Sequence, residues 1–159
     1  MTPLTGLLLL VVTVVGMEAV AYSLHRWVMH GPGWFLHRSH HRPRDGWYEH
    51  NDWYAVIFAG PSILLIYGAL HWGWWSGLAW IGTGVAAYGL IYFVFHDLLV
   101  HRRIPHRFVA KSGYLKRIMQ AHRLHHAVGD KDGAVSFGFL WAPAPQRLKQ
   151  KLKRGEPQR

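Results

Sequence analysis

The fold class is decided by residues 55–96, which read AVIFAGPSILLIYGALHWGWWSGLAWIGTGVAAYGLIYFVFH and contain no Asp, Glu, Lys or Arg. A helix of about 20 apolar residues crosses the hydrocarbon of a bilayer, so this stretch is long enough to cross twice. A third apolar run, from Leu4 to Tyr22, has Glu18 as its one charged residue. The sequence therefore predicts an all-α fold, an integral membrane helical bundle that forms a single domain over residues 1–159.

The expected membrane spans are residues 4–24, 53–70 and 78–95. The first has no basic residue before it and no clear cleavage site after it, which favours a retained span over a signal peptide. Its helix should continue to His30 and end at Gly31-Pro32-Gly33, and Asn51 or Asp52 is the expected N-cap of the second span. Partly re-entrant ends would give a similar pattern, so three and four spans both remain open.

The net charge of +10 is unevenly distributed, because all eighteen Lys and Arg fall within residues 26–44 and 102–159, which flank the apolar runs. Three crossings return both blocks to one side of the membrane, and an excess of basic residues marks the cytoplasmic side. This topology, together with contact to anionic lipid head groups, accounts for the charge, so no nucleic-acid partner is expected. There is no cysteine, which excludes disulfides and thiolate metal sites.

Ten of the thirteen histidines form one pattern that occurs twice, each time after a membrane span. In both copies an H-x4-H pair is followed by an H-x2-H-H triplet: His25, His30, His37, His40 and His41, then His96, His101, His122, His125 and His126. On an α-helix the members of a triplet share a face and can present three imidazoles to a common point. The members of a pair lie about 140° apart, so they could serve two metals or straddle a cleft between helices.

Neutral imidazole is a common ligand for iron, zinc, copper and nickel, and ten imidazoles exceed the three or four that one zinc takes. The sequence therefore predicts a two-metal site in a cytoplasmic histidine-rich cap built from residues 25–50 and 96–130. It leaves open which histidine binds which ion. Four residues are candidates for supporting these ligands: Asp97, which could accept the second ring N–H of His101, Glu18, which shares a helix face with His25, and His50 and His106.

Two further patterns lie in the third span. Gly82-x-Gly84-x-x-Ala87 matches a relaxed dinucleotide fingerprint but follows no strand, so it favours close helix packing instead. One face of the same helix, with Tyr88, Tyr92, Phe93 and Phe95, either lines a channel for an apolar substrate or packs between spans.

The sequence resembles the bacterial carotenoid (β-carotene) hydroxylases, within the superfamily of fatty acid hydroxylases and sterol desaturases. The similarity covers nearly the whole chain and is carried by four segments: AYSLHRWVMHG (21–31), HRSHH (37–41) with Asn51-Asp52 following, FVFHDLLVH (93–101) and HRLHH (122–126). The resemblance implies that the ten histidines bind two irons, that O2 is activated there, and that C3 of a β-ionone ring is hydroxylated. It also implies a carotenoid substrate taken from the bilayer, an external ferredoxin-type electron donor, and a location in the bacterial cytoplasmic (inner) membrane.

Other functions remain open from the residues alone. A fatty acid or other acyl-lipid hydroxylase, a desaturase or a ketolase of the same superfamily would share the histidines. A histidine-rich membrane protein that binds or transports metal belongs to another class, but its ligands should lie near mid-membrane, whereas these histidines follow the spans.

Overall fold

The computed structural model describes residues 1–44 and 46–155, so Asp45 and residues 156–159 of the predicted domain, Arg159 of the second basic block included, lie outside the described residues. All regular secondary structure in the described residues is helical, which confirms the all-α fold. The α-helices are α1 (Pro3–Ser23), α2 (Trp34–His37), α3 (Trp53–His71), α4 (Gly77–Tyr92), α5 (Gly113–His125) and α6 (Pro145–Arg154). Two π-helical segments, η1 (Leu24–Met29) and η3 (Phe93–Val100), continue α1 and α4, and a short 3₁₀ turn, η2 (His50–Asp52), precedes α3.

Within the described residues, three continuous helices are long and apolar enough to cross a membrane: Pro3–Met29, His50–His71 and Gly77–Val100. The protein itself buries only 6%, 11% and 17% of their most apolar windows. The remaining apolar surface therefore needs lipid around it. The first and third helices continue past the expected ends of their spans, at residues 24 and 95, and thus project into the histidine-rich region.

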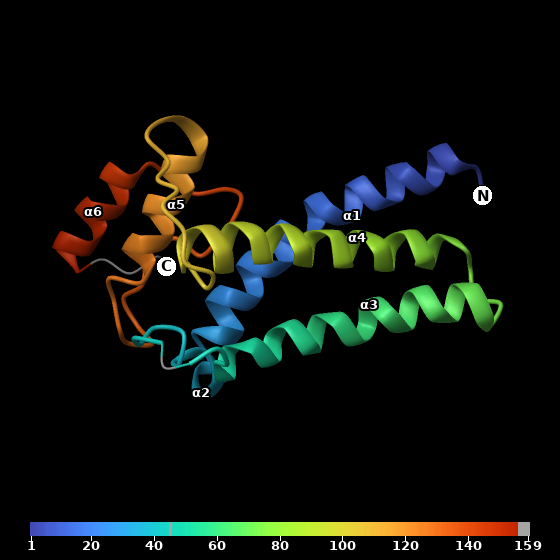
Figure 1. The fold of residues 1–159 in the computed structure, drawn as a ribbon, viewed down its shortest axis with the longest axis horizontal. Helices are drawn as coiled ribbons and strands as arrows, with labels where there is room; N and C mark the ends of the chain where they lie inside the picture. Colours follow the sequence, from blue (N-terminus) through green and yellow to red (C-terminus); the bar gives the residue numbers. More distant parts are fainter. Residues whose placement is uncertain (45, 156–159) are drawn as a thin grey trace.

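The three long helices lie side by side, with α4 between α1 and α3 (Figure 1). The N-terminus and the α3–α4 turn lie at one end of the bundle, and a cap containing α2, α5 and α6 lies at the other (Figure 1). The described parts of both basic blocks belong to this cap end. The structure thus brings together the two charged segments that the sequence separates.

Glycines let α4 approach both neighbours closely. A methyl group added at Gly82 would lie 2.8 Å from the carbonyl oxygen of Ser62 in α3, and one at Gly84 would lie 3.0 Å from that of Leu10 in α1. The Ser62 hydroxyl also donates to the carbonyl oxygen of Gly82 over 2.8 Å. Gly82 and Gly84 therefore serve close helix packing, as the sequence predicts.

The apolar segment 134–144 is largely buried inside the cap. Val135 and Ala142 pack with Ile118 and Ala121 of α5 and with Leu148 of α6. Phe139 packs on the bundle side, against Tyr88 of α4 and other residues. The segment adopts no regular helix or strand, and its position places its backbone next to the histidines.

Candidate metal centre

The two H-x4-H pairs lie on the π-helical segments η1 and η3, and this changes their geometry. The N–H of His30 donates to the carbonyl of His25 over 3.0 Å, and that of His101 to the carbonyl of His96 over 2.9 Å. A π-turn closes on the fifth residue, so the members of each pair are stacked along one side of the helix. The expected 140° separation of each pair is therefore wrong, because it assumes an α-helix.

The two triplets differ in local structure. His122 and His125 lie in the last turns of α5 and His126 is its C-cap. His37 ends the short α2, while His40 and His41 lie in the turns that follow it, outside any helix. Equivalent sequence patterns are thus presented by different backbones.

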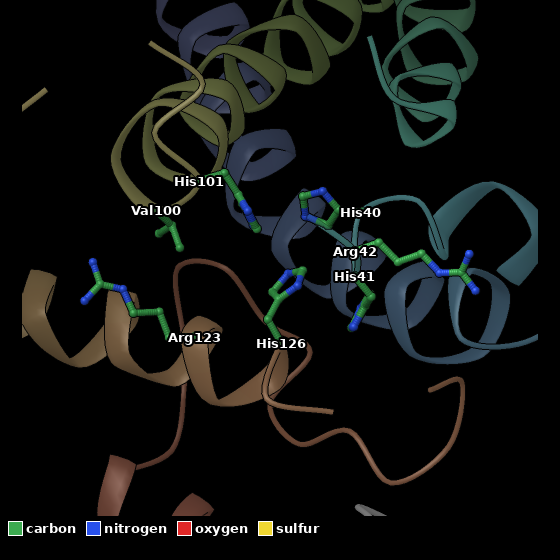
Figure 2. Close-up of a pocket in the computed structure, with 7 residues that line it drawn as sticks. All are labelled: His40, His41, Arg42, Val100, His101, Arg123 and His126. Carbon is green, nitrogen blue, oxygen red and sulfur yellow. The ribbon is translucent and has the colours of Figure 1, made fainter. Parts of the chain in front are cut away.

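All ten histidines come together, in two groups of five whose ligand nitrogens lie within 4.8 Å of one another. The first group contains His25, His30, His37, His41 and His125, and the second contains His40, His96, His101, His122 and His126. Each group contains one H-x4-H pair together with the first and last histidines of the triplet that follows that pair. Its fifth member is the middle histidine of the other triplet. Figure 2 shows this crossing for His40, which lies beside His101 and His126. The triplets therefore do not each converge on one point, as their spacing had suggested.

In the first group every Nδ1 atom donates its hydrogen to a neutral oxygen. Asn51 Oδ1 accepts from His37 over 2.7 Å, and the other four acceptors are backbone carbonyls between residues 128 and 137. These are Phe137 for His25, Lys131 for His30, Val128 for His41 and Val135 for His125, at 2.9, 2.8, 2.9 and 3.3 Å. Because a carbonyl only accepts hydrogen bonds, each of these rings carries its proton on Nδ1 and a lone pair on Nε2.

These lone pairs face one another. The Nε2 atoms of His30 and His125 are 3.1 Å apart, and those of His25 and His37 are 3.2 Å apart. Neutral rings held in these tautomers repel at such distances unless a cation lies between them. A metal ion bound at about 2.1 Å from each nitrogen brings neighbouring ligand nitrogens to this separation, so the donor set fits a metal.

The second group has carboxylates behind its rings. His40 Nδ1 donates to Glu49 Oε2 over 2.9 Å, and His96 Nδ1 lies 3.6 Å from Asp97 Oδ1. Arg103 links Asp97 to Asp52, because its guanidinium bonds Asp52 at 2.5 and 3.2 Å and lies 3.5 Å from Asp97. The Nε2 atoms again converge: His40 to His96 at 2.8 Å, and His122 to His101 and His126 at 3.0 and 2.9 Å.

Burial keeps the cap histidines neutral. Desolvation lowers the pKa of His41 and of His101 to about 4 and that of His126 to about 2. Desolvation is also the largest cause of the lowered pKa of His30, His37, His40, His122 and His125. Neutral imidazoles at pH 7 have a lone pair ready for a metal. His41 Nε2 is buried and lacks a hydrogen-bond partner, as expected of a ligand atom.

The four residues proposed to support the ligands lie in different places. Asp97 lies beside His96 rather than His101. Glu18 accepts from the backbone N–H groups of Phe139, Leu140 and Trp141 and from the Tyr88 hydroxyl. His106 accepts from the N–H of Phe108 and bonds the carbonyl of Leu98. His50 lies on η2, where its ring contacts Tyr48.

Sequence reasoning missed Glu49 and Asn51, which bond His40 and His37. Glu49 shares a reciprocal capping arrangement with Asp52 around η2, in which Asp52 Oδ2 accepts the N–H of Glu49 over 3.0 Å. Asp52 is the N-cap residue of α3, as the sequence predicts, but its side chain accepts the N–H of Glu49 and not one from α3. The E-x-x-D spacing was a readable signal for the turn, but not for the contact to His40.

Two cavities lie beside the histidine groups. An apolar cavity of about 390 Å³ lies between α1, α3 and α4 and is lined by Tyr88, Tyr92, Phe93 and Phe139 among others. A second cavity, of about 290 Å³, opens on the polar side of the cap and is lined by His40, His41, Arg42, Val100, His101, Arg123 and His126 (Figure 2). Residues Tyr88, Tyr92 and Phe93 thus line a cavity, as one of the two interpretations of that helix face predicts, while Phe95 does not line it.

The chain is similar to known proteins over most of its length. A family model described as fatty acid hydroxylase matches residues 10–143. The beta-carotene hydroxylase of Pantoea ananas is 55% identical over 92% of this chain and 82% of its own length. That of Paracoccus sp. (strain PC1) is 53% identical over 95% of this chain and 93% of its own length. The chloroplastic beta-carotene 3-hydroxylase 1 of Arabidopsis thaliana is 42% identical over 81% of this chain and 42% of the plant protein.

No solved structure matches the chain. The resemblance drawn from the histidine segments is confirmed by these relatives, and the match to the family model covers well over half of the sequence. The chain therefore belongs to the fatty acid hydroxylase family.

Proposed function

We propose that this membrane protein hydroxylates C3 of the β-ionone rings of β-carotene, giving β-cryptoxanthin and then zeaxanthin, with O2 as oxidant. The names of the similar bacterial and plant proteins support the substrate. The single observation that carries the proposal is the apolar cavity between the spans, because it ends at rings that touch candidate ligands. Tyr92 lies with its ring centroid 4.4 Å from that of His96, and its hydroxyl is 3.4 Å from His96 Nε2.

The cavity suits one end of a long apolar molecule. Its volume of about 390 Å³ lies within the range of pockets that enclose small molecules, and its walls are mostly apolar. A carotenoid is longer than such a pocket, so one ring enters while the rest of the molecule stays in the bilayer. The exposed apolar sides of the spans are consistent with substrate that arrives from lipid.

The cofactor we propose is a pair of iron ions, one in each group of five histidines. When bound, these ions supply the activation of O2 and the removal of hydrogen from an unactivated carbon. The protein orients the ligands through the Nδ1 bonds described above, and it excludes water from the apolar cavity. All ten candidate ligands are neutral imidazoles, so the carboxylates behind the second group would be the nearest negative charges to a bound ion.

The electrons come from outside the chain in this proposal, from a ferredoxin-type protein. The polar cavity is the best-supported point of electron transfer, because His41, His101 and His126 are its half-buried lining residues and are also candidate ligands. Arg42 and Arg123 are exposed at its rim and would attract an acidic partner. We place this cap on the cytoplasmic side of a bacterial inner membrane, which the basic residues at the cap end support.

The proposal is tested by producing the chain in a bacterium engineered to accumulate β-carotene, with a ferredoxin supply, and identifying pigments by chromatography and mass spectrometry. His125→Ala is the matched control, because His125 is fully buried in the first group. New mono- and dihydroxylated carotenoid that disappears in the control is the expected result. Unchanged β-carotene, with well-produced protein that hydroxylates an acyl lipid instead, would overturn the carotenoid assignment.

A further inference from the structure

We propose that Phe139 is the end wall of the apolar cavity, and that its position selects C3 as the carbon that is hydroxylated. This inference rests on the proposed function and names the residue that sets its regiochemistry. Phe139 is 7% exposed and belongs to the lining of the cavity. It comes from the irregular segment 134–144 of the cap, whereas most of the other lining residues belong to the three spans.

Phe139 lies between part of the cavity and both histidine groups. Its ring stacks on that of His25 in the first group, with centroids 5.5 Å apart and planes at 15°. It also lies 5.2 Å from the ring of His96 and 5.7 Å from that of His122 in the second group. Tyr92 meets the same phenyl ring edge to face at 4.4 Å and completes the wall. A molecule in the cavity therefore meets these two rings at the end nearest the candidate ligands, where Asn51 and Asp97 also line the cavity.

Glu18 of α1 fixes this wall in place. Its Oε1 accepts the backbone N–H groups of Phe139, Leu140 and Trp141 at 2.9, 3.0 and 3.1 Å. Its Oε2 accepts the hydroxyl of Tyr88, another cavity residue, over 2.8 Å. A carboxylate inside a membrane span is unfavourable unless it is paired, and four donors account for its presence here. Glu18 is thus a positioning residue that ties the wall to the first span.

The chemistry of the substrate explains why a wall selects C3. The polyene chain of a β-ionone ring is attached at C6, and C3 is the ring atom directly opposite that bond. A ring that enters first, with the polyene trailing in the bilayer, therefore leads with C3. If the wall stops the ring before it turns, only C3 comes next to the metal groups. A shorter side chain at position 139 gives the ring room to turn and present C2 or C4.

The test uses Phe139→Ala, Phe139→Leu and Phe139→Met in the carotenoid-producing bacterium, with product positions assigned by mass spectrometry and NMR. The reaction keeps its balance in all variants: one C–H bond becomes C–O–H, the second oxygen atom leaves as water, the external donor supplies two electrons, and solvent supplies two protons. We expect the ratio of 2- or 4-hydroxylated to 3-hydroxylated product to rise about tenfold or more in the Ala variant and by less in the other two. Glu18→Gln, which weakens the anchor, should shift the same ratio slightly.

Phe137→Leu is the matched control. Phe137 is also buried and contacts His25, His30 and His125, but it does not line the cavity, so its variant should keep the C3 selectivity. Metal content of the purified proteins is measured in parallel, and the Leu and Met variants decide the matter if the Ala variant does not bind metal. Normal metal content with unchanged product positions overturns the role of Phe139 while the proposed function stands. A wild-type protein that makes no hydroxylated carotenoid overturns both.

Discussion

The two histidine groups have the same number of imidazoles and nearly the same sequence pattern, yet their surroundings differ. Behind the first group lie four backbone carbonyls and one amide oxygen. Behind the second lie the carboxylates of Glu49 and Asp97, the latter 3.5 Å from Arg103. The second group also supplies His40, His101 and His126 to the polar cavity, to which the first group contributes only His41 among the lining residues described.

This difference teaches that a repeated ligand pattern does not produce equivalent sites. A carboxylate that accepts the Nδ1 hydrogen makes Nε2 a stronger donor to a metal than a carbonyl does. Burial raises the pKa of Glu49, and the positive charge of Arg103 opposes that rise. In the second group, His40 would therefore bind a metal ion more strongly than a ring whose Nδ1 hydrogen goes to a carbonyl.

The largest expected effect is on metal content, and it tests the finding that each group contains the middle histidine of the other group's triplet. His37→Ala/His41→Ala removes two ligands from the first group and leaves three there, so we expect the loss of about one of the two metals. His37→Ala/His40→Ala removes one ligand from each group and leaves four in both, which is still a full tetrahedral set, so both metals should remain at saturating metal. Metal per protein is measured on purified protein loaded with Zn²⁺.

This pair of variants has its own control, since both remove two histidines of one triplet. If each triplet served a single metal, the two variants would lose the same amount. Equal metal content in the two proteins would contradict the grouping of His40 with His96, His101, His122 and His126.

The next largest effect concerns the carboxylates. Glu49→Gln should weaken metal binding at the second group about 10- to 100-fold and leave the first group unchanged, because the amide is a poorer acceptor for His40 Nδ1. Asn51→Asp is the reciprocal variant, which places a carboxylate behind His37 and should strengthen the first group. Stepwise Co²⁺ titration, followed by optical absorption, resolves the two affinities. A uniform weakening of both steps in Glu49→Gln would indicate a general loss of structure and contradict the asymmetry.

A smaller effect is expected at the open side of the second group. Arg42→Glu/Arg123→Glu should lower the rate of electron transfer from an acidic ferredoxin about tenfold, and less at high ionic strength, because rim charges act mainly on association. Turnover with a small neutral reductant should change little. Arg147→Glu on α6 serves as control, because Arg147 does not line the cavity. An unchanged ferredoxin rate would exclude this rim as the docking point.

The sequence predicts well what depends on composition and on repeated residue types. Long apolar runs predict the three spans, and the doubled histidine pattern predicts ten residues that the structure brings together. It does not predict which histidines share a group, because this depends on π-helical turns at Leu24–Met29 and Phe93–Val100 that spacing alone does not encode. An α-helical interpretation of the same spacing separates the members of each pair.

The hydrogen bonds behind the first group could not be predicted from the sequence either. Backbone carbonyls have no residue type, so nothing in the sequence marks Val128, Lys131, Val135 or Phe137 as partners of histidines. Ser136 lies between Val135 and Phe137, two of these residues, and it is buried with a φ of 65°. Such a conformation costs a residue other than glycine about 1 kcal/mol or more and depends on the packing around it. Long-range packing, not local preference, therefore builds that half of the centre.

The smallest expected effect concerns Asn51, the one side-chain acceptor behind the first group, and tests how much it contributes to the orientation of that group. Ser39 Oγ accepts the N–H of Asn51 over 3.2 Å and donates to the carbonyl of Leu36 over 2.9 Å, and Asn51 in turn bonds His37. Ser39→Ala removes two neutral hydrogen bonds worth about 1 kcal/mol each, so the thermal midpoint of the metal-loaded protein should fall by only several degrees. Ser39→Thr keeps the hydroxyl and should restore most of that loss. Because the other four rings of the first group bond to backbone, its metal affinity should hardly change. A large fall in that affinity would show that Asn51, and not the carbonyls of residues 128–137, dominates the orientation of the first group.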